Sequence, residues 1–319
     1  MEAIKVRGLV KNFGKKEAVK GIDFSVSAGE IFGFLGPNGA GKTTTINMLI
    51  GLLKVTGGTV EILGKNLNTQ TEAIQAEIGV VPDESNLYPE MSGMDNLTFC
   101  GSLYGMKKKD REKRALELLK AFQLDDVKGK SYMAYSRGMK RKLTIAAAMM
   151  HEPKILFLDE PTSGIDVSSA RQIRKMIEEL HRHGATVFLT THYLEEAERL
   201  CQRIAFIVDG RVMQTGSVET LKGSLRDQAA LQIRLDGSAE ALMDPLKNEM
   251  KVSKVEVVSE KVLKISWPPE KELTSLLDFF QNQQYHIYEA KRIEPTMEEV
   301  FVSITGIDHS ERKEMASRG

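Results

Sequence analysis

Short apolar runs alternate with amphipathic segments along the first two thirds of the chain. Period-two or continuous apolar patterns predict six strands, the second of which runs into glycine: "AIKVRGLV" (3–10), "FSVSAGEIFGFLG" (24–36), "GTVEILG" (58–64), "EIGVVPD" (77–83), "KILFLDE" (154–160) and "ATVFLTTH" (185–192). Helical spacing predicts four helices between them: "GKTTTINMLIGLL" (41–53), "KLTIAAAMM" (142–150), "RQIRKMIEELHRHG" (171–184) and "YLEEAERLC" (193–201). This alternation, up to about residue 220, predicts a mostly parallel sheet with helices on both faces.

Residues 92–122 have a helical pattern, which we expect to be interrupted by the cationic run "KKKDREKR" (107–114). We interpret this run as a solvated helix face; a contact with anionic lipid headgroups is the alternative.

The pattern changes near "LKGSLRDQ" (221–228), where we expect a linker. Beyond it the chain has the order strand, helix, strand, strand, helix, strand, which is that of the ferredoxin-like split unit. Thr296 and Glu299 have capping-box spacing before a further apolar helix. We therefore predict a larger α/β domain at 1–222, a linker at 223–230, an α+β accessory domain at 231–306 and a charged tail at 307–319.

The bulk composition excludes several classes of protein. The 319 residues are 41% hydrophobic and 28% charged, which is ordinary for a globular chain and long enough for two domains. The formal net charge of zero argues against a general nucleic-acid binder. Two cysteines without metal-ligand spacing favour a reducing compartment. The opening "MEAIKVRGLV" lacks the features of a signal peptide, and no apolar run reaches the roughly 18–20 residues of a membrane span.

The stretch "GPNGAGKTT" follows an apolar strand and opens a helix, which is the context of a phosphate-binding P-loop. Its glycines allow backbone N–H groups to surround phosphate oxygens, and the helix start adds positive potential. Lys42 then reaches the β- and γ-phosphates, and the Thr43 hydroxyl is placed for Mg²⁺. The full set expected to bind nucleotide here is Gly36, Asn38, Gly39, Ala40, Gly41, Lys42, Thr43 and Thr44.

Two further segments end buried strands in polar side chains. "ILFLDEPTSGID" (155–166) delivers Asp159 and Glu160 to the carboxyl end of a strand, where open α/β sheets bind ligands. We expect Asp159 to support Mg²⁺ and Glu160 to act as general base on the attacking water. His192 follows the next strand, where it can contact the γ-phosphate or the attacking water; a surface or capping histidine is the alternative.

At these residues the chain resembles the ATP-binding subunits of ATP-binding cassette (ABC) transporters, over about residues 1–220. "GPNGAGKTT" is similar to Walker A, "ILFLDE" to Walker B, "SGID" with Asp166 to the D-loop, and "YSRGMK" lies where the family has its signature L-S-G-G-Q. The segments "YSRGMKRKL" and "PTMEEVF" resemble those of the ABC-2-type export ATPases. The resemblance implies an α/β, P-loop NTPase fold: a RecA-like core with a mostly parallel sheet, an antiparallel β part and a helical subdomain at about 84–150, plus the small C-terminal α+β domain.

The resemblance also implies a mechanism and partners. Two cassettes, most simply identical copies related by a two-fold axis, enclose two ATP molecules and drive a separately encoded permease. Such a subunit would lie at the cytoplasmic face of the membrane, held there by the permease. Ser136, Arg137 and Gly138 would cap the γ-phosphate bound to the partner, with Asp166 beside them. Phe13, in "KNFGKKEAV", would stack on adenine, and Val19 would belong to the same nucleotide-binding set.

Two positions depart from the family pattern. Asp83 stands where the Q-loop has glutamine, so a short charged side chain replaces a long neutral ligand for Mg²⁺. Arg137 replaces the first glycine of the signature; its side chain could obstruct close backbone approach or contact phosphate. Met139 replaces the usual signature glutamine.

Three classes of function remain in competition on the sequence alone. The leading hypothesis is an export ATPase with ATP and Mg²⁺ as its cofactors and no nucleic-acid partner. A soluble ABC-type ATPase acting on nucleic acid or the ribosome is the alternative, although the chain has neither a second cassette nor a basic surface pattern. A non-hydrolysing, ATP-gated binding module is a third class, which Glu160 and His192 disfavour.

Overall fold

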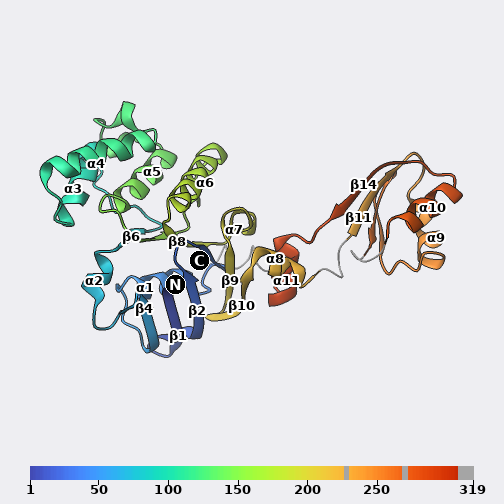
Figure 1. The fold of residues 1–319 in the computed structure, drawn as a ribbon, viewed down its shortest axis with the longest axis horizontal. Coiled ribbons are helices and arrows are strands. Elements are labelled where there is room, and N and C mark those ends of the chain that lie inside the picture. Colours follow the sequence, from blue (N-terminus) through green and yellow to red (C-terminus); the bar gives the residue numbers. More distant parts are fainter. Residues whose placement is uncertain (226–229, 268–271, 308–319) are drawn as a thin grey trace. The chain divides into compact units, whose positions relative to one another are not determined.

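The computed structural model describes residues 1–225, 230–267 and 272–307, which divide into two compact units, Met1–Ser217 and Val218–Gly306 (Figure 1). The division falls five residues before the expected boundary at 222. The expected linker at 223–230 lies partly outside the described residues, as does the expected tail from residue 308 onward. No helix within the described ranges is long and apolar enough to cross a bilayer.

The first unit is built on a six-stranded sheet whose strands are parallel except at one edge. In spatial order it consists of β10 (Arg211–Ser217), β9 (Arg203–Val208), β3 (Ile31–Leu35), β8 (Thr186–Thr191), β7 (Ile155–Asp159) and β6 (Ile78–Val81). Strands β3, β7 and β8 are buried along their whole length, as expected for parallel strands covered on both faces. The predicted α/β class with a mostly parallel sheet is therefore confirmed.

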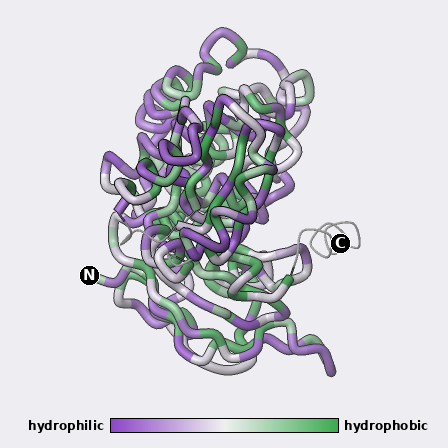
Figure 2. The backbone as a smooth tube through the Cα atoms, turned by 90° about the vertical axis from the view of Figure 1, so that its right-hand side faces the viewer, coloured by the Kyte–Doolittle hydropathy of each residue, from purple (hydrophilic) through white to green (hydrophobic). Residues whose placement is uncertain are grey.

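An antiparallel sheet packs beside this core. Its spatial order is β2 (Lys16–Ser27), β1 (Glu2–Phe13), β4 (Gly57–Ile62) and β5 (Lys65–Asn66). The two sheets share one apolar core, in which Phe24 stacks on Phe32 of β3 with ring centroids 5.8 Å apart. Figure 2 shows the hydrophobic segments, in green, lying mostly inside.

The helices of the first unit connect and cover these strands, and three of them form a separate helical region. That region contains α3 (Gly93–Leu103), α4 (Lys108–Ala121) and α5 (Arg137–Ala148), which Figure 1 shows together in green. The remaining helices are α1 (Lys42–Leu49), α2 (Thr71–Gln75), α6 (Val167–Arg182) and α7 (Leu194–Leu200).

Three details differ from the sequence analysis. The cationic run 107–114 does not interrupt a helix: Lys107 caps α4, and the run forms its first two turns, while the break lies at Tyr104–Met106. The segment 24–36 holds the end of β2 and all of β3, separated by a turn at Gly29. The hairpin β9–β10 was not predicted, although its turn Asp209–Gly210, with φ of 46° and 74°, is a hairpin signal between two apolar runs.

The second unit contains the predicted β-α-β-β-α-β order. Its strands are β11 (Ala230–Leu235), β12 (Val255–Ser259), β13 (Val262–Ser266) and β14 (Ile287–Ile293), paired antiparallel in the order β12-β13-β11-β14. Helices α9 (Met243–Asn248) and α10 (Thr274–Asn282) lie together on one side of this sheet (Figure 1). The buried Trp267 and Phe280 lie in the core formed by the sheet and these helices.

Two helices flank that core in sequence, α8 (Val218–Gly223) and α11 (Met297–Thr305). Thr296 and Glu299 form the predicted capping box at the start of α11.

Candidate functional site

The P-loop runs from the end of β3 to the start of α1, and close packing explains two of its glycines. A Cβ at Gly36 would lie 2.1 Å from the carbonyl oxygen of Ile207, and one at Gly41 would lie 2.8 Å from that of Ala18. Gly41 also has a φ of 104°, a conformation that glycine adopts readily. Lys42 is buried and donates hydrogen bonds to the carbonyl oxygens of Gly36 (2.8 Å) and Pro37 (3.2 Å). The loop therefore holds its lysine against its own backbone.

The rest of the predicted P-loop set lies around Lys42 in the same turn. Asn38 and Gly39 are exposed at the tip of the loop, and Ala40 is buried. Thr43 is exposed and Thr44 half-buried in the first turn of α1.

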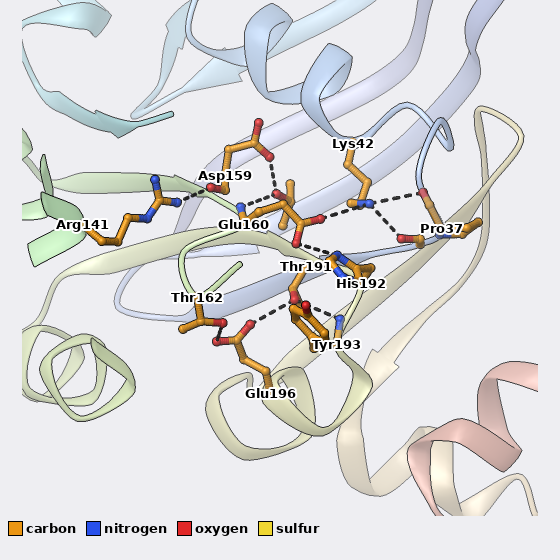
Figure 3. A network of polar contacts seen from close by, with 12 residues as sticks. Pro37, Lys42, Arg141, Asp159, Glu160, Thr162, Thr191, His192, Tyr193 and Glu196 are labelled. Carbon is orange, nitrogen blue, oxygen red and sulfur yellow. Dashed lines mark hydrogen bonds and ion pairs between the residues drawn. The ribbon is translucent and has the colours of Figure 1, made fainter. Parts of the chain in front are cut away.

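Strand β7 delivers two acidic residues beside this loop. Asp159 is buried and accepts a hydrogen bond from the hydroxyl of Thr190, its cross-strand neighbour on β8. Glu160 has a φ of 47°, in the left-handed region that costs a non-glycine residue about 1 kcal/mol or more. Its amide donates to the carbonyl (3.2 Å) and hydroxyl (3.1 Å) oxygens of Thr190, which holds the turn. This turn directs the Glu160 carboxylate toward the P-loop (Figure 3).

Glu160, Lys42 and His192 form one cluster (Figure 3). Glu160 Oε1 lies 3.2 Å from Lys42 Nζ, and Glu160 Oε2 accepts a hydrogen bond from His192 Nδ1 at 2.9 Å. The Glu160 and Lys42 side chains are only 11% and 6% exposed, so water screens this ion pair weakly. The structure thus brings Lys42 together with Glu160 and His192, which lie more than a hundred positions further along the sequence.

The electrostatics of this cluster favour an ionised Glu160. Burial raises the pKa of the carboxyl, but the hydrogen bond from His192 and the charge of Lys42 outweigh it, and the pKa is lowered. A carboxylate that stays charged at neutral pH can accept a proton, as a general base must.

Asp83 follows β6 and is exposed at the surface, although part of its carboxyl is shielded from water. Burial raises its pKa, the charge of Arg141 opposes that rise, and the charges of Asp159 and Glu160 add to it. Asp83 is therefore within electrostatic reach of the two acids on β7. No cluster of three or more histidine, cysteine or acidic side chains suited to a metal occurs within the described ranges.

The signature residues lie at the start of α5. Ser136 caps this helix, its hydroxyl accepting from the Met139 amide at 3.3 Å, and Arg137 is exposed in the first turn. A Cβ at Gly138 would lie 2.2 Å from the Ser169 hydroxyl oxygen, so α5 and α6 meet closely there.

Asp166 caps α6 beside this contact, and its carboxylate accepts from the Ser169 amide at 2.9 Å. Hydrogen bonds from the Ser169 side chain and from its amide lower the pKa of Asp166. The signature and Asp166 thus form a second group, bonded to their own helix starts rather than to Lys42 or Glu160.

Phe13 and Val19 come from neighbouring strands. The Phe13 ring at the end of β1 is 49% exposed, with Lys11 Nζ 4.9 Å from its centroid. Val19 on β2 is fully buried beneath Gly41 of the P-loop. An exposed ring is available for stacking, whereas Val19 supports the loop from below.

Arg141 is a residue of the site that the sequence analysis missed. It is 7% exposed, and its guanidinium donates to four carbonyl oxygens, those of Pro82, Asp83, Asp159 and Pro161. One side chain of α5 therefore holds the backbone at the ends of both β6 and β7. A signal was present: Arg141 shares a helix face with the apolar Ile145 and Ala148, which predicts burial.

Glu196 on α7 is the second residue missed. Its buried carboxylate accepts hydrogen bonds from the hydroxyls of Thr162 (2.5 Å) and Thr191 (3.0 Å), and burial raises its pKa. It thereby joins the segment after Glu160 to the segment before His192. Nothing in "YLEEAERLC" distinguishes this glutamate from its neighbours.

With this geometry established, the comparisons with known proteins can be interpreted. Residues 19–163 match the family model described as ABC transporter. The chain is 37% identical over 306 residues to the linearmycin resistance ATP-binding protein of Bacillus subtilis, covering 95% of this chain and 98% of that protein. It is 41% identical to the daunorubicin/doxorubicin resistance ATP-binding protein of Streptomyces peucetius, covering 73% and 70%.

Solved structures agree with this match. An ATP-binding subunit of an ABC transporter superposes with a TM-score of 0.64 at 29% identity, covering 70% of this chain and 93% of that one. A dimeric ATP-binding cassette bound to ADP and phosphate has a TM-score of 0.63 at 28% identity, covering 67% and 98%. The fold and the site define a P-loop ATPase of the cassette type. The chain belongs to the ABC transporter family, as an ATP-binding subunit.

Proposed function

We propose that this chain hydrolyses ATP to power export through a separately encoded membrane permease. The cluster of Lys42, Glu160 and His192 carries the proposal, because it combines a phosphate-binding cation with an ionised base and a histidine. Relatives named for linearmycin and daunorubicin resistance, and a fluoroquinolone export protein of Mycobacterium tuberculosis that is 41% identical, support export as the process. Binding to nucleic acid or ribosomes is not favoured.

The reaction assigns a role to each residue of the cluster. Lys42 exchanges its contact with Glu160 for the β- and γ-phosphates, and the P-loop amides surround the same oxygens. Water attacks the γ-phosphorus and ADP leaves, while Glu160 accepts the proton of that water. His192, bonded to Glu160 Oε2, orients the carboxylate and contacts the γ-phosphate.

Mg²⁺ fits the oxygen ligands at this site. Magnesium prefers one or two carboxylates together with hydroxyl, water and phosphate oxygens, so a larger protein cluster is not needed. Thr43, Asp159 and Asp83 would supply the protein ligands. When bound, the ion would neutralise charge on the β- and γ-phosphates.

A second cassette completes the site, and we propose an identical copy. Ser136, Arg137 and Gly138 lie at a helix start, where N–H groups favour an anion, and would cap the γ-phosphate bound to the other copy. Asp166 would lie at the same interface, and Phe13 would stack on adenine. The dimeric form of a similar cassette supports this arrangement. Residues 1–222 would form the ATPase domain, including a helical subdomain at about 84–150, and residues 231–306 would form the accessory domain. The permease would hold the subunit at the cytoplasmic face of the membrane.

Glu160→Gln tests the assignment directly. The amide keeps the size of the side chain but cannot accept the proton. The variant should therefore still bind ATP and accumulate as a dimer with it. Its hydrolysis should be roughly 100-fold slower or more, as expected for the loss of a general base. Glu195→Gln, an exposed glutamate on α7, is the matched control and should behave as wild type. ATPase rates and sedimentation velocity with ATP are the measurements. Normal turnover together with a monomer in ATP would show the base assignment to be wrong.

A pull-down tests the transport partner. The chain, tagged and expressed with a membrane protein of about six spans encoded beside its gene, should co-purify with it from detergent, and ATP turnover should respond to that protein. Absence of co-purification, together with salt-sensitive RNA binding, would favour the alternative function.

A further inference from the structure

Strand β14 forms an exposed edge of the sheet in the second unit. It pairs with β11 on one side, and no other described strand pairs with it on the other. The five residues 288–292 are all exposed, and Tyr288 is 66% exposed. An exposed strand edge offers unpaired N–H and C=O groups to another strand.

The sequence of β14 is complementary to itself when two copies run antiparallel about Ala290. Ile287 then lies opposite Ile293, Tyr288 opposite Arg292, and Glu289 opposite Lys291. Each pair is apolar, cation–aromatic or of opposite charge, the kinds of cross-strand pair that stabilise antiparallel sheets.

We propose that β14 pairs with β14 of a second copy of this chain, across a two-fold axis at Ala290. The two four-stranded sheets then join edge to edge into one antiparallel sheet. Both chains contribute the same surface, as a two-fold interface requires. The inference concerns the same partner as the proposed homodimer, but it rests on a surface that does not include the ATPase residues.

The charges on β14 would otherwise keep this edge apart, since lysine and arginine on an edge strand commonly discourage pairing. In the proposed register, each charged side chain of β14 lies opposite a side chain of the other copy that attracts it. Within one chain Glu289 faces Arg234 of β11 at 3.7 Å, with both side chains more than half exposed. A surface pair of that kind is weak and leaves Glu289 able to bind Lys291 of the other copy.

Seven residues of strand pairing give modest affinity, and the ATP-bound cassettes would raise the local concentration of the two strands. The contact should therefore be measurable both without nucleotide and, more strongly, with ATP.

Cross-linking at the two-fold axis provides the first test. Ala290→Cys, in a full-length chain whose Cys100 is replaced by serine, should form a covalent dimer with a short bismaleimide, because the two cysteines would lie directly opposite each other. Val258→Cys is the matched control, since Val258 is 53% exposed on β12, the other edge of the same sheet. If Ala290→Cys gives no more dimer than Val258→Cys, with or without ATP, the proposal is wrong.

Charge exchange provides a test of the register. Glu289→Lys places Lys opposite Lys291, and Lys291→Glu places Glu opposite Glu289, so each variant alone should weaken cross-linking roughly 10- to 30-fold, two pairs being altered per dimer. An equimolar mixture of the two variants restores both opposite-charge pairs, and so does the double variant. Both should recover wild-type cross-linking.

The control for this second test is Glu256→Lys, the same charge change on β12, and it should leave cross-linking unaltered. Loss of cross-linking that neither the mixture nor the double variant restores would overturn the register, and no loss at all would overturn the interface. Sedimentation of a chain that carries both Glu160→Gln and Glu289→Lys, with and without ATP, reports the ATPase interface, because the second change weakens the β14 contact. Absence of an ATP-dependent dimer in this variant would contradict the proposed function and leave the β14 result standing.

Discussion

Glu160 holds Lys42 by an ion pair of 3.2 Å, so the proposed base and the phosphate-binding cation are bonded to each other across the P-loop. The carboxylate thus occupies the contact that a phosphate would make with Lys42 in the proposed reaction. One anion has to replace another when ATP binds, and the mutual attraction of Lys42 and Glu160 opposes that exchange. Release of Glu160 from the lysine would at the same time free the carboxylate to accept a proton from water.

Removal of this competition should strengthen nucleotide binding. Glu160→Gln deletes the negative charge nearest Lys42, so we expect the Kd for ATP to fall by roughly tenfold, about 1.4 kcal/mol. Isothermal titration calorimetry at concentrations where the chain stays monomeric measures this directly. Glu195→Gln should leave the Kd unchanged, and an unchanged Kd for Glu160→Gln would mean that the ion pair does not oppose ATP.

The lowered pKa of Glu160 predicts how this group contributes to stability as the pH changes. The folded chain keeps the carboxylate ionised to lower pH than the unfolded chain, whose pKa is near the ordinary 4.5. Its contribution to the free energy of unfolding is therefore fully present above about pH 5.5 and is lost as the pH falls through the lower, folded pKa. Urea denaturation of wild type and Glu160→Gln should give a stability difference that favours wild type near pH 7 and declines below pH 4.5.

The contribution of Glu196 to the free energy of unfolding should change with pH in the opposite direction, which makes it a control. Burial raises its pKa, so its contribution is present at low pH and is lost as the pH rises through the folded value. Relative to Glu196→Gln, wild type should lose stability as the pH rises from the ordinary value of 4.5 toward the raised pKa of the folded chain, whereas the Glu160 difference does not fall over this range. The same trend for both variants would contradict the opposite pKa shifts.

Much of the fold and the P-loop could be predicted because their signals are local. The strand before Gly36 and the helix from Lys42 are each encoded by a few adjacent residues, and the apolar run before Asp159 is unmistakably a buried strand. The family resemblance then supplied the roles expected of Glu160 and His192, but not the hydrogen bond between them. The helix predicted at 142–150 begins five residues earlier, at Arg137 after the N-cap Ser136, and this earlier start places the expected signature residues in its first turn.

The missed features depend on contacts between distant segments. Arg141 stands in the run "KRK", where solvated cations are common, and its four carbonyl partners lie 18 to 59 residues away. The charge pattern of β14 has no meaning until β14 is known to be an edge strand. For the run 107–114, the interpretation as a solvated helix face is confirmed, and only the expected interruption of the helix was wrong, because lysine, arginine and glutamate are good helix formers.

Arg137 should assist the ATP-bound dimer. It is exposed in the first turn of α5, beside the backbone that would cap a phosphate, and its guanidinium can bind phosphate oxygens. We expect Arg137→Gly to weaken ATP-induced dimerisation about tenfold at low salt, and Arg137→Lys to weaken it less. Sedimentation velocity in the Glu160→Gln background, at low and high salt, measures the effect. Tighter dimerisation of Arg137→Gly would mean instead that the arginine obstructs the approach of the other copy.

Arg141 should set the rate of hydrolysis by positioning the backbone around the two acids. Its guanidinium holds the carbonyls of Asp83 and Asp159, so movement of α5 is transmitted to both. Arg141→Ala leaves these buried acceptors unsatisfied and should lower the free energy of unfolding by roughly 2–4 kcal/mol.

Arg141→Lys separates positioning from folding, because it keeps the charge but loses the planar fork that reaches several carbonyls at once. We expect the chain to fold, with kcat for ATP lowered roughly tenfold and KM changed less than about threefold, since the misplaced groups act on the transition state more than on binding. Lys140→Ala, one residue earlier on α5 and half-buried, is the control and should keep the wild-type kcat. A folded Arg141→Lys chain with wild-type kcat would reduce Arg141 to a purely structural role.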